Sequence, residues 1–571
     1  MYGVPTDHAL RAWKDCPFVR MGLLLPEEAI SLVDRFFMHM APQSQILDGF
    51  FADHDSHHIL VSHEKFLSCA ILTVSSRHHH LGGTRGASRC QLIHFRLWEY
   101  CQRFITQLVF GESDYFGSGL RTLGTVEALL LLLEWHPLPL LTPMPLEDCT
   151  DSHTWEPLQT SDSSSAARTA PQVLAKEVAD RAKKSDRFSL MILSCAITLA
   201  NELCISGNVD SEPYSIKINP YQHELRLRKR RSPLCKVLYV YSEHLLMRTG
   251  SKQLVPRNAY LGSITTKESQ EIIDESFDQF MDARSELARV SRMVFDTLPP
   301  STTVDQVYLQ SARCTEMVDH FLCVLDTWER RFLASFASGE AVKVDAQRED
   351  IMIAEHQTVK IITASAGLRA LTRHNTSLWS QEDIATSDIL AGQRQYARVI
   401  IDASLEILHL ATRLAQHNAL VYGSENLFMR IALASALIVV ALGFEIEKAK
   451  LVASRSALEQ VIEALKKDEP DDLHLASYYA ALLEQCLSSI PPITEKSSMP
   501  LQGVVLGDAG HWSAPTCNSN LMEKHTDPER RPFAYGAIGP QDALGTQENP
   551  TSGGFSIPMS PYLMKLVDGT A

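Results

Sequence analysis

The sequence predicts an all-α protein. Apolar residues recur at the three- and four-residue spacing of a helix over long stretches, whereas the short alternating runs typical of β-strands are few. Prolines fall where such helices would begin or end. With 45% hydrophobic residues, the 571-residue chain has enough apolar material for a large core. We therefore expect a large multi-helix domain.

Residues 1–143 are predicted to form the N-terminal part of this helical domain. Pro26 is followed by two glutamates and then by apolar residues at helical spacing. Proline suits the first turn of a helix, and acidic side chains there interact favourably with the helix dipole. A second helix is predicted over residues 126–135, ending before Pro137.

The rest of the chain divides by composition. Residues 144–185 are predicted to be a flexible linker, because residues 160–170 within them are rich in small polar residues and have no periodicity. Residues 186–489 return to a helical period, strongest over 273–294 and 399–414, and are predicted to form the main helical part. In residues 490–571 proline, glycine, serine and asparagine dominate, which predicts a disordered tail.

Charge and cysteine usage limit the partners and the compartment. The formal net charge of −15 argues against non-specific binding to a phosphate backbone. The twelve cysteines include no Cys-x-x-Cys pair, the spacing that lets two thiolates share a metal. No secretory signal opens the sequence, and its longest apolar runs, 129–133 and 431–444, are too short for a bilayer. We expect an intracellular protein without a membrane anchor.

A compact basic run is a candidate nuclear import signal, because receptors for nuclear import read short clusters of lysine and arginine. It precedes a Ser-Pro pair and consists of Arg226, Arg228, Lys229, Arg230 and Arg231. The same run fits the solvated end of a helix, and both interpretations stay open.

Three sequence patterns are candidates for catalytic or metal sites. His54 and His58 are spaced to share a metal on a helix, but no glutamate follows the first histidine as in a zinc protease helix. Asp471 and Asp472 could hold magnesium, although capping of a helix start explains them better. The glycines at 82 and 83 lack the lysine of a phosphate loop. We therefore predict no catalytic residue, no metal site and no cofactor site in this chain.

Several stretches resemble the middle homology region of fungal zinc binuclear-cluster transcription factors. The closest likeness is to regulators of aromatic amino-acid catabolism, and it extends in one consistent order over residues 20–488. The stretches are residues 45–48, 75–78, 93–98, 120–131, 134–137, 185–187, 199–203, 238–241 and 471–475.

The resemblance implies an all-helical regulatory domain in a nuclear protein that forms a homo- or heterodimer. It implies a transcriptional regulator of a catabolic or secondary-metabolite gene set, which contacts the transcriptional machinery. Family members read DNA through an N-terminal cluster in which six cysteines hold two zinc ions, and no cysteines of this chain have that spacing. We therefore expect this chain to reach DNA only indirectly, or through a missing N-terminal cluster. Two alternatives are an all-helical metal-dependent enzyme and a cluster-less dimerisation partner that inhibits a full-length regulator.

Overall fold

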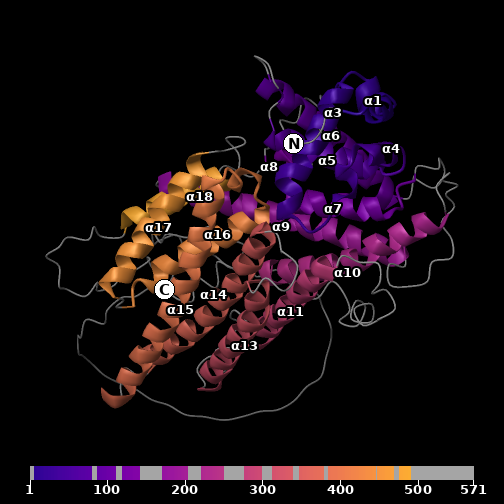
Figure 1. Cartoon of the computed structure of the whole chain (residues 1–571). Helices are drawn as coiled ribbons and strands as arrows, with labels where there is room; N and C mark the ends of the chain where they lie inside the picture. Colours follow the sequence, from indigo (N-terminus) through magenta and orange to yellow (C-terminus); the bar gives the residue numbers. More distant parts are fainter. Residues whose placement is uncertain are drawn as a thin grey trace, which may run out of the picture. The chain divides into compact units, whose positions relative to one another are not determined.

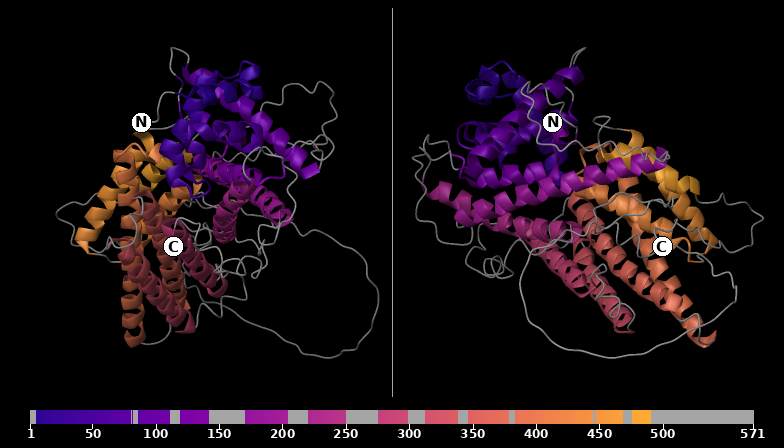
Figure 2. Two further views of the ribbon diagram at one scale, coloured as in Figure 1. Left: turned by 45° about the vertical axis from the view of Figure 1, so that its right-hand side comes forward. Right: turned by 180° about the vertical axis from the view of Figure 1, so that it is seen from behind.

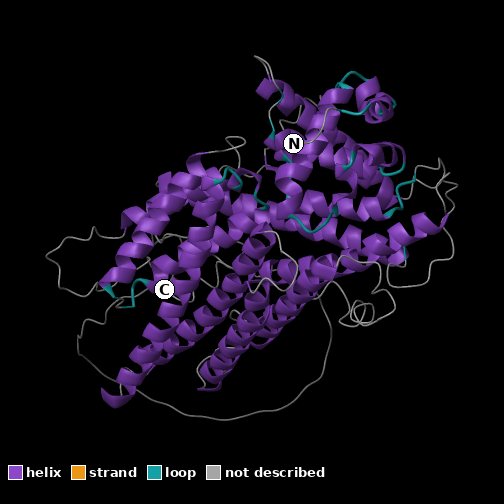
Figure 3. Ribbon diagram, viewed as in Figure 1, coloured by secondary structure: helices purple, strands orange, loops and turns teal. Residues whose placement is uncertain are grey.

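The computed structural model describes most of the chain up to residue 489, and every regular element in this part is helical (Figure 3). The all-α prediction is confirmed for these residues. None of the described helices is long and apolar enough to cross a bilayer. The described residues are 5–79, 81, 86–110, 119–141, 170–203, 220–249, 275–298, 312–337, 346–377, 383–444, 447–467 and 475–489.

The first group of helices is built around α5 and α7. Helix α5 contacts α3, α4, α6 and α7, and α1 lies against α3 and α4. The helices of this group are α1 (Asp7–Lys14), α2 (Pro17–Arg20), α3 (Pro26–Arg35), α4 (His57–Ser62), α5 (Lys65–His78), α6 (Gly86–Phe110), α7 (Leu123–Glu134) and α8 (Leu138–Leu141).

The second group contains the longest helices, of which α14 and α15 lie side by side (Figures 1 and 2). Helix α14 also contacts α11, α13 and α16. The helices are α9 (Ala170–Glu202), α10 (Pro220–Thr249), α11 (Glu275–Thr297), α13 (Ala312–Ala337), α14 (Ala346–Ser377), α15 (Asp383–Gln416), α16 (Glu425–Ala441), α17 (Lys448–Lys467) and α18 (Leu475–Ser489).

The helix predicted at Pro26 begins there, with Leu25 as the residue before its first turn. The Glu28 carboxylate accepts a hydrogen bond from the Leu25 backbone N–H at 2.9 Å, which satisfies one of the donors that a helix start leaves open. The same carboxylate pairs with Arg89 on α6. One acidic residue therefore starts α3 and ties it to α6.

Helix α7 is buried along its entire length, as its apolar run predicts. It contacts α5 on one side and α9 and α10 on others, so it joins the two groups of helices. Its two charged residues, Glu127 and Glu134, are only 3% and 4% exposed. Buried carboxylates need partners, because desolvating an unpaired charge costs several kcal/mol.

The start of α7 is packed against the carboxylate of Glu64, the residue immediately before α5. The Glu64 side chain accepts a hydrogen bond of 2.7 Å from the Thr122 hydroxyl, next to the first turn of the helix. A Cβ atom added at Gly124 would lie 2.1 Å from Glu64 Oε2, much closer than any real contact. Only glycine allows the carboxylate to approach the helix start this closely.

Replacing Gly124 by alanine should therefore destabilise the protein, although alanine normally favours a helix. The methyl group must displace Glu64 from its hydrogen bond, and we expect a loss of about 1–3 kcal/mol in the free energy of unfolding. Urea denaturation, monitored by circular dichroism, measures this loss in the free energy of unfolding. Gly49→Ala is the matched control, because nothing lies within 4 Å of a Cβ atom there. Equal stability of the two variants would contradict the packing argument.

The predicted linker differs from the structure at its C-terminal end. Helix α9 begins at Ala170 and runs without interruption past Asp186, so residues 170–185 are helical and Asp186 does not open a helix. The first turns of α9 directly follow small polar residues that have no helical period, so composition places the boundary too late. Residues 142–169 of the predicted linker, and the predicted tail 490–571, lie outside the described residues.

The connection between α15 and α16 is held by residues of the first group. The Trp135 indole donates to the Tyr422 carbonyl at 3.1 Å, and the Gln43 amide donates to the Ala419 carbonyl at 2.7 Å. The Tyr422 ring stacks on both His39 and His79, with ring centroids 4.7 and 5.0 Å apart. The N-terminal residues therefore fix the start of α16, which carries part of the candidate site.

Candidate functional site

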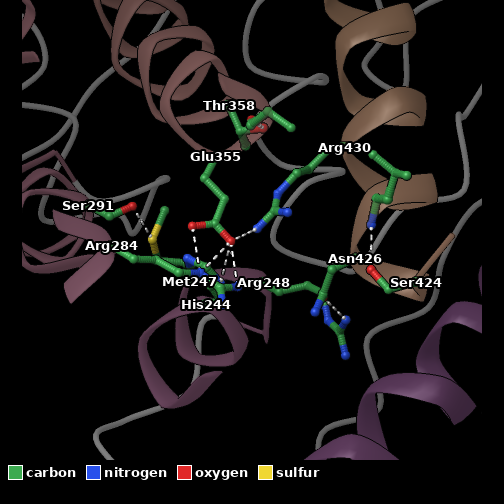
Figure 4. A network of polar contacts seen from close by, with 12 residues as sticks. His244, Met247, Arg248, Arg284, Ser291, Glu355, Thr358, Ser424, Asn426 and Arg430 are labelled. Carbon is green, nitrogen blue, oxygen red and sulfur yellow. Dashed lines mark hydrogen bonds and ion pairs between the residues drawn. The ribbon is translucent and has the colours of Figure 1, made fainter. Parts of the chain in front are cut away.

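A buried carboxylate, Glu355 on α14, is the centre of the candidate site. Arg284 on α11 donates to both of its oxygens, with N···O distances of 2.7–3.1 Å. Arg430 on α16 donates to Glu355 Oε1 at 3.1 Å. Figure 4 shows the two guanidinium groups reaching the carboxylate from different sides. The site thus joins three helices that are far apart in sequence.

The charges at this centre are unequal in number. Burial by itself would raise the pKa of Glu355, but the nearby positive charges, Arg284 first among them, lower it to about 2. Glu355 is therefore ionised, and its single negative charge is shared by two guanidinium groups. Burial lowers the pKa of His244, which lies 3.9 Å from Glu355, to about 3. This histidine is consequently neutral and adds no charge near neutral pH.

A cavity of about 70 Å³ adjoins the centre and opens toward solvent. Arg430, Asn426, Arg248 and Glu355 are among the polar residues on its wall, and most of the lining surface is apolar. The apolar lining includes Met247, Val359, Ile362, Met429 and Leu433. A small pocket with a few converging polar groups is the usual form of a ligand site.

A second ion pair, between α10 and α9, lies next to the start of α16. Arg248 on α10 lies 2.7 Å from Asp186 Oδ1 and donates to Asn426 Oδ1 at 3.2 Å. Burial raises the pKa of Asp186, whereas Arg248 and His136 oppose that rise. Arg248 orients Asn426, whose amide nitrogen then remains a donor at the cavity.

A smaller cavity of about 30 Å³ lies on the other side of the arginine pair. Arg284, Arg430 and Asn426 line it together with Glu134 from α7. Burial raises the pKa of Glu134, whereas Ser44 and the charges of Arg284 and Arg430 oppose the rise. Glu134 connects the arginine centre to the helix that joins the two groups.

Fixed guanidinium groups beside a partly apolar cavity are suited to binding an anion. Arginine presents planar N–H donors that match a carboxylate, and in a buried setting such contacts are stronger than in water. Ser291 lines the cavity, and its hydroxyl donates to Met247 Sδ and not to a general base as a nucleophile would require. The arrangement favours binding.

The candidate import signal is divided by the structure. Arg230 is buried, donates to both Glu127 oxygens at 3.0 and 2.5 Å, and donates to Glu64 at 3.0 Å. Its side chain is 8% exposed, so Arg230 adds little to any exposed basic surface, and the import signal as a whole stays a prediction. Arg231 is half-buried. The side chains of Arg226, Arg228 and Lys229, on α10, lie outside the described residues.

The candidate metal histidines have other partners. His54 lies 3.0 Å from Asp34, and the His58 ring packs edge-on against His8. His57 accepts a hydrogen bond from the Trp13 indole at 3.0 Å. Within the described ranges, no three histidine, cysteine or acidic side chains are grouped to hold a metal ion. Asp471, Asp472 and the glycines at 82 and 83 lie outside the described residues.

Local sequence patterns do not reveal the arginine centre. Arg284, Glu355 and Arg430 are 71 and 75 residues apart, so no spacing motif links them. The available signal was a charge inside an apolar helical face, as at Arg430 immediately before the run 431–442. Such isolated charges need a buried partner, but the sequence does not reveal which partner.

Two buried histidines should make the fold sensitive to mild acid. Burial lowers the pKa of His57 to about 4 and that of His244 to about 3, below the usual 6.5. Below pH 6.5 the unfolded chain binds protons that the folded chain does not, so stability falls as pH falls toward these values. At pH 5.5 we expect each histidine to cost about 1 kcal/mol.

Urea unfolding at pH 7.5 and 5.5 measures this loss in the free energy of unfolding. The variants His57→Gln and His244→Gln should each flatten the pH dependence, because glutamine does not titrate. A native protein equally stable at both pH values would show that neither histidine is kept neutral by the fold.

The chain is 34% identical over 488 residues to a protein named transcription factor hmgR from Aspergillus fumigatus. The aligned region covers 84% of this chain and 64% of the relative, so the chain spans less than two thirds of that relative's length. No protein-family profile and no solved structure matches the chain. The chain is thus homologous to a fungal protein named as a transcription factor.

Proposed function

We propose that this chain is the helical regulatory part of a transcriptional regulator and not an enzyme. The observation that carries the proposal is the 34% identity to transcription factor hmgR over 84% of the chain. The buried ion-paired centre fits a regulatory role, because its side chains are arranged to hold one another and to face a small cavity.

The finer proposal is that the protein acts in the nucleus on a metabolic gene set. It rests on the resemblance to the middle homology region, whose residues include the helix α7 and the stretch that follows it. In this stretch Trp135 donates to the Tyr422 carbonyl, and His136 lies 3.1 Å from Ser189. Residues within the stretches that resemble the middle homology region therefore hold the two groups of helices together. A regulatory signal would depend on this junction between the two groups.

A reporter assay tests the regulatory proposal. The full chain is fused to a heterologous DNA-binding domain and expressed in a fungal host that carries the matching binding site before a reporter gene. We expect reporter output to change relative to the DNA-binding domain alone. Unchanged output from a fusion that accumulates normally and occupies its site, measured by chromatin immunoprecipitation, would contradict the proposal.

Nuclear import through the basic run requires its own test. We expect the triple substitution of Arg226, Arg228 and Lys229 by alanine to move a fluorescent fusion from the nucleus to the cytoplasm. The matched control replaces three basic residues on the exposed face of α9, Lys183, Lys184 and Arg187. Nuclear accumulation of both variants would mean that import does not depend on this run.

We further propose that the chain forms a homo- or heterodimer, contacts the transcriptional machinery, and reaches DNA through another polypeptide segment. Light scattering of the purified chain tests self-association, and co-purification with a zinc-cluster regulator tests hetero-association. A monomer over the micromolar range that captures no such regulator would contradict the dimer proposal.

A further inference from the structure

Two guanidinium groups, Arg284 and Arg430, contact one carboxylate beside the larger cavity, and Arg430 and Glu355 both line that cavity. Glu355 is a single carboxylate, and Arg284 already donates to both of its oxygens. Among the described residues, Arg430 makes one hydrogen bond, and this bond goes to an oxygen that Arg284 also uses. A guanidinium group has five N–H donors, so Arg430 retains most of its donor capacity.

The other charged groups near the cavity include Glu134, which acts on both Arg284 and Arg430; burial raises its pKa and so favours its uncharged form. Arg248 is balanced by Asp186 at 2.7 Å, and His244 is neutral near pH 7. Glu134 lines the smaller cavity and not the larger one. A buried positive charge without a full counter-charge is costly, and an anion in the cavity would remove that cost.

The size and the lining of the cavity limit the anion. Its volume is about 70 Å³. A benzene ring needs a cavity of roughly 150 Å³. The side chains of Val359, Ile362 and Leu433 form part of the apolar lining of the same cavity. A ligand that fits both halves has one anionic group for Arg430 and Asn426 and a short aliphatic body.

We propose that the cavity between α10, α14 and α16 binds a small aliphatic monocarboxylate through Arg430 and Asn426. Calling this ligand a regulatory signal rests on the proposed function, whereas binding itself does not. The carboxylate receives N–H donors from both side chains, and its aliphatic part lies against the apolar wall. Because Asn426 belongs to the first turn of α16, the ligand contacts the helix whose start the N-terminal group holds.

The binding test uses the complete chain and sodium propionate as the probe, at constant ionic strength. Propionate should raise the melting temperature saturably, by roughly 2 °C or more at ten times its Kd. Propionamide has the same shape without the charge and should have no effect. Sodium phosphate and sodium benzoate test a general anion site and a larger ring. An equal shift with phosphate, or a larger shift with benzoate than with propionate, would overturn the proposed ligand class.

Three variants locate the site. Arg430→Met should weaken propionate binding about 10- to 100-fold, because a charge-assisted hydrogen bond is lost while Glu355 stays paired with Arg284. Thr358→Met extends a half-buried cavity side chain into the ligand space and should abolish binding without removing a charge. If Arg430→Met does not fold, Thr358→Met still tests whether propionate binds in this cavity. Arg413→Met removes an exposed arginine paired with Asp350 and should bind propionate like the native chain.

Glu355→Gln gives a test in the opposite direction, because it removes the carboxylate that accepts a hydrogen bond from Arg430. We expect this variant, measured at low temperature where it remains folded, to bind propionate at least as tightly as the native chain. Native-like propionate binding by Thr358→Met would place the ligand elsewhere and overturn the proposal. Propionate binding without any reporter response would contradict the proposed regulation but not the proposed site. A reporter response without propionate binding would contradict the proposed site but not the proposed regulation.

Discussion

Glu355→Gln should be among the most destabilising single substitutions in the chain. Glutamine keeps the size of the side chain but removes the charge that Arg284 and Arg430 share. The carboxylate is 1% exposed, so water does not replace it. Breaking a buried ion pair by removing one partner typically costs 3–5 kcal/mol, and we expect a loss of about that size in the free energy of unfolding.

The measurement is urea denaturation of the native and variant chains at pH 7.5. Glu349→Gln on the same helix is the matched control, because Glu349 has no ion pair with any described residue and should change stability by less than about 0.5 kcal/mol. A double-mutant cycle with Arg430→Met measures the coupling between the two residues. A loss below about 1 kcal/mol for Glu355→Gln would mean that the arginine centre does not stabilise the fold.

Arg230→Gln should be comparably destabilising, because it leaves two carboxylates buried without a cation. The guanidinium group donates to Glu127 and Glu64, whose side chains are 4% and 9% exposed. Burial raises the pKa of Glu127 to about 7, and Arg230 is the main group that opposes the rise. Without the arginine both carboxyl groups must protonate or be solvated, and we expect a loss of about 3–5 kcal/mol.

Acid should partly rescue Arg230→Gln, because protonation removes the repulsion between the two carboxylates. Its stability relative to the native chain is therefore expected to improve between pH 7.5 and 6. Arg121→Gln is the control, since Arg121 pairs with Glu202 at the surface and such pairs contribute about 1 kcal/mol or less. If Arg230→Gln costs no more than Arg121→Gln, Arg230 is better regarded as a surface residue of the basic run.

Helix positions were the most predictable part of the fold. The start at Pro26, the buried run of α7 and the apolar faces of α11 and α15 all follow from local spacing. Such features depend on residues three or four positions apart, which the sequence shows directly. The start of α9 was missed because its first turns follow a polar stretch without a clear period.

The basic run illustrates why site residues were less predictable. Five cations within six positions look alike in sequence, yet the structure buries Arg230 between two carboxylates of the first helical group. The choice depends on where Glu64 and Glu127 lie, 166 and 103 residues away. Local sequence contains no information about such distant partners, and the import signal as a whole stays a prediction.

By itself, the sequence determined that this protein is helical, where most of its described helices lie, and which faces they bury. The physical reason is that helix periodicity and hydrophobic burial act on near neighbours along the chain. Only the tertiary structure decided which charges are buried together. The centre of Arg284, Glu355 and Arg430 exists because α11, α14 and α16 meet, and ion pairing between distant residues depends on that packing alone.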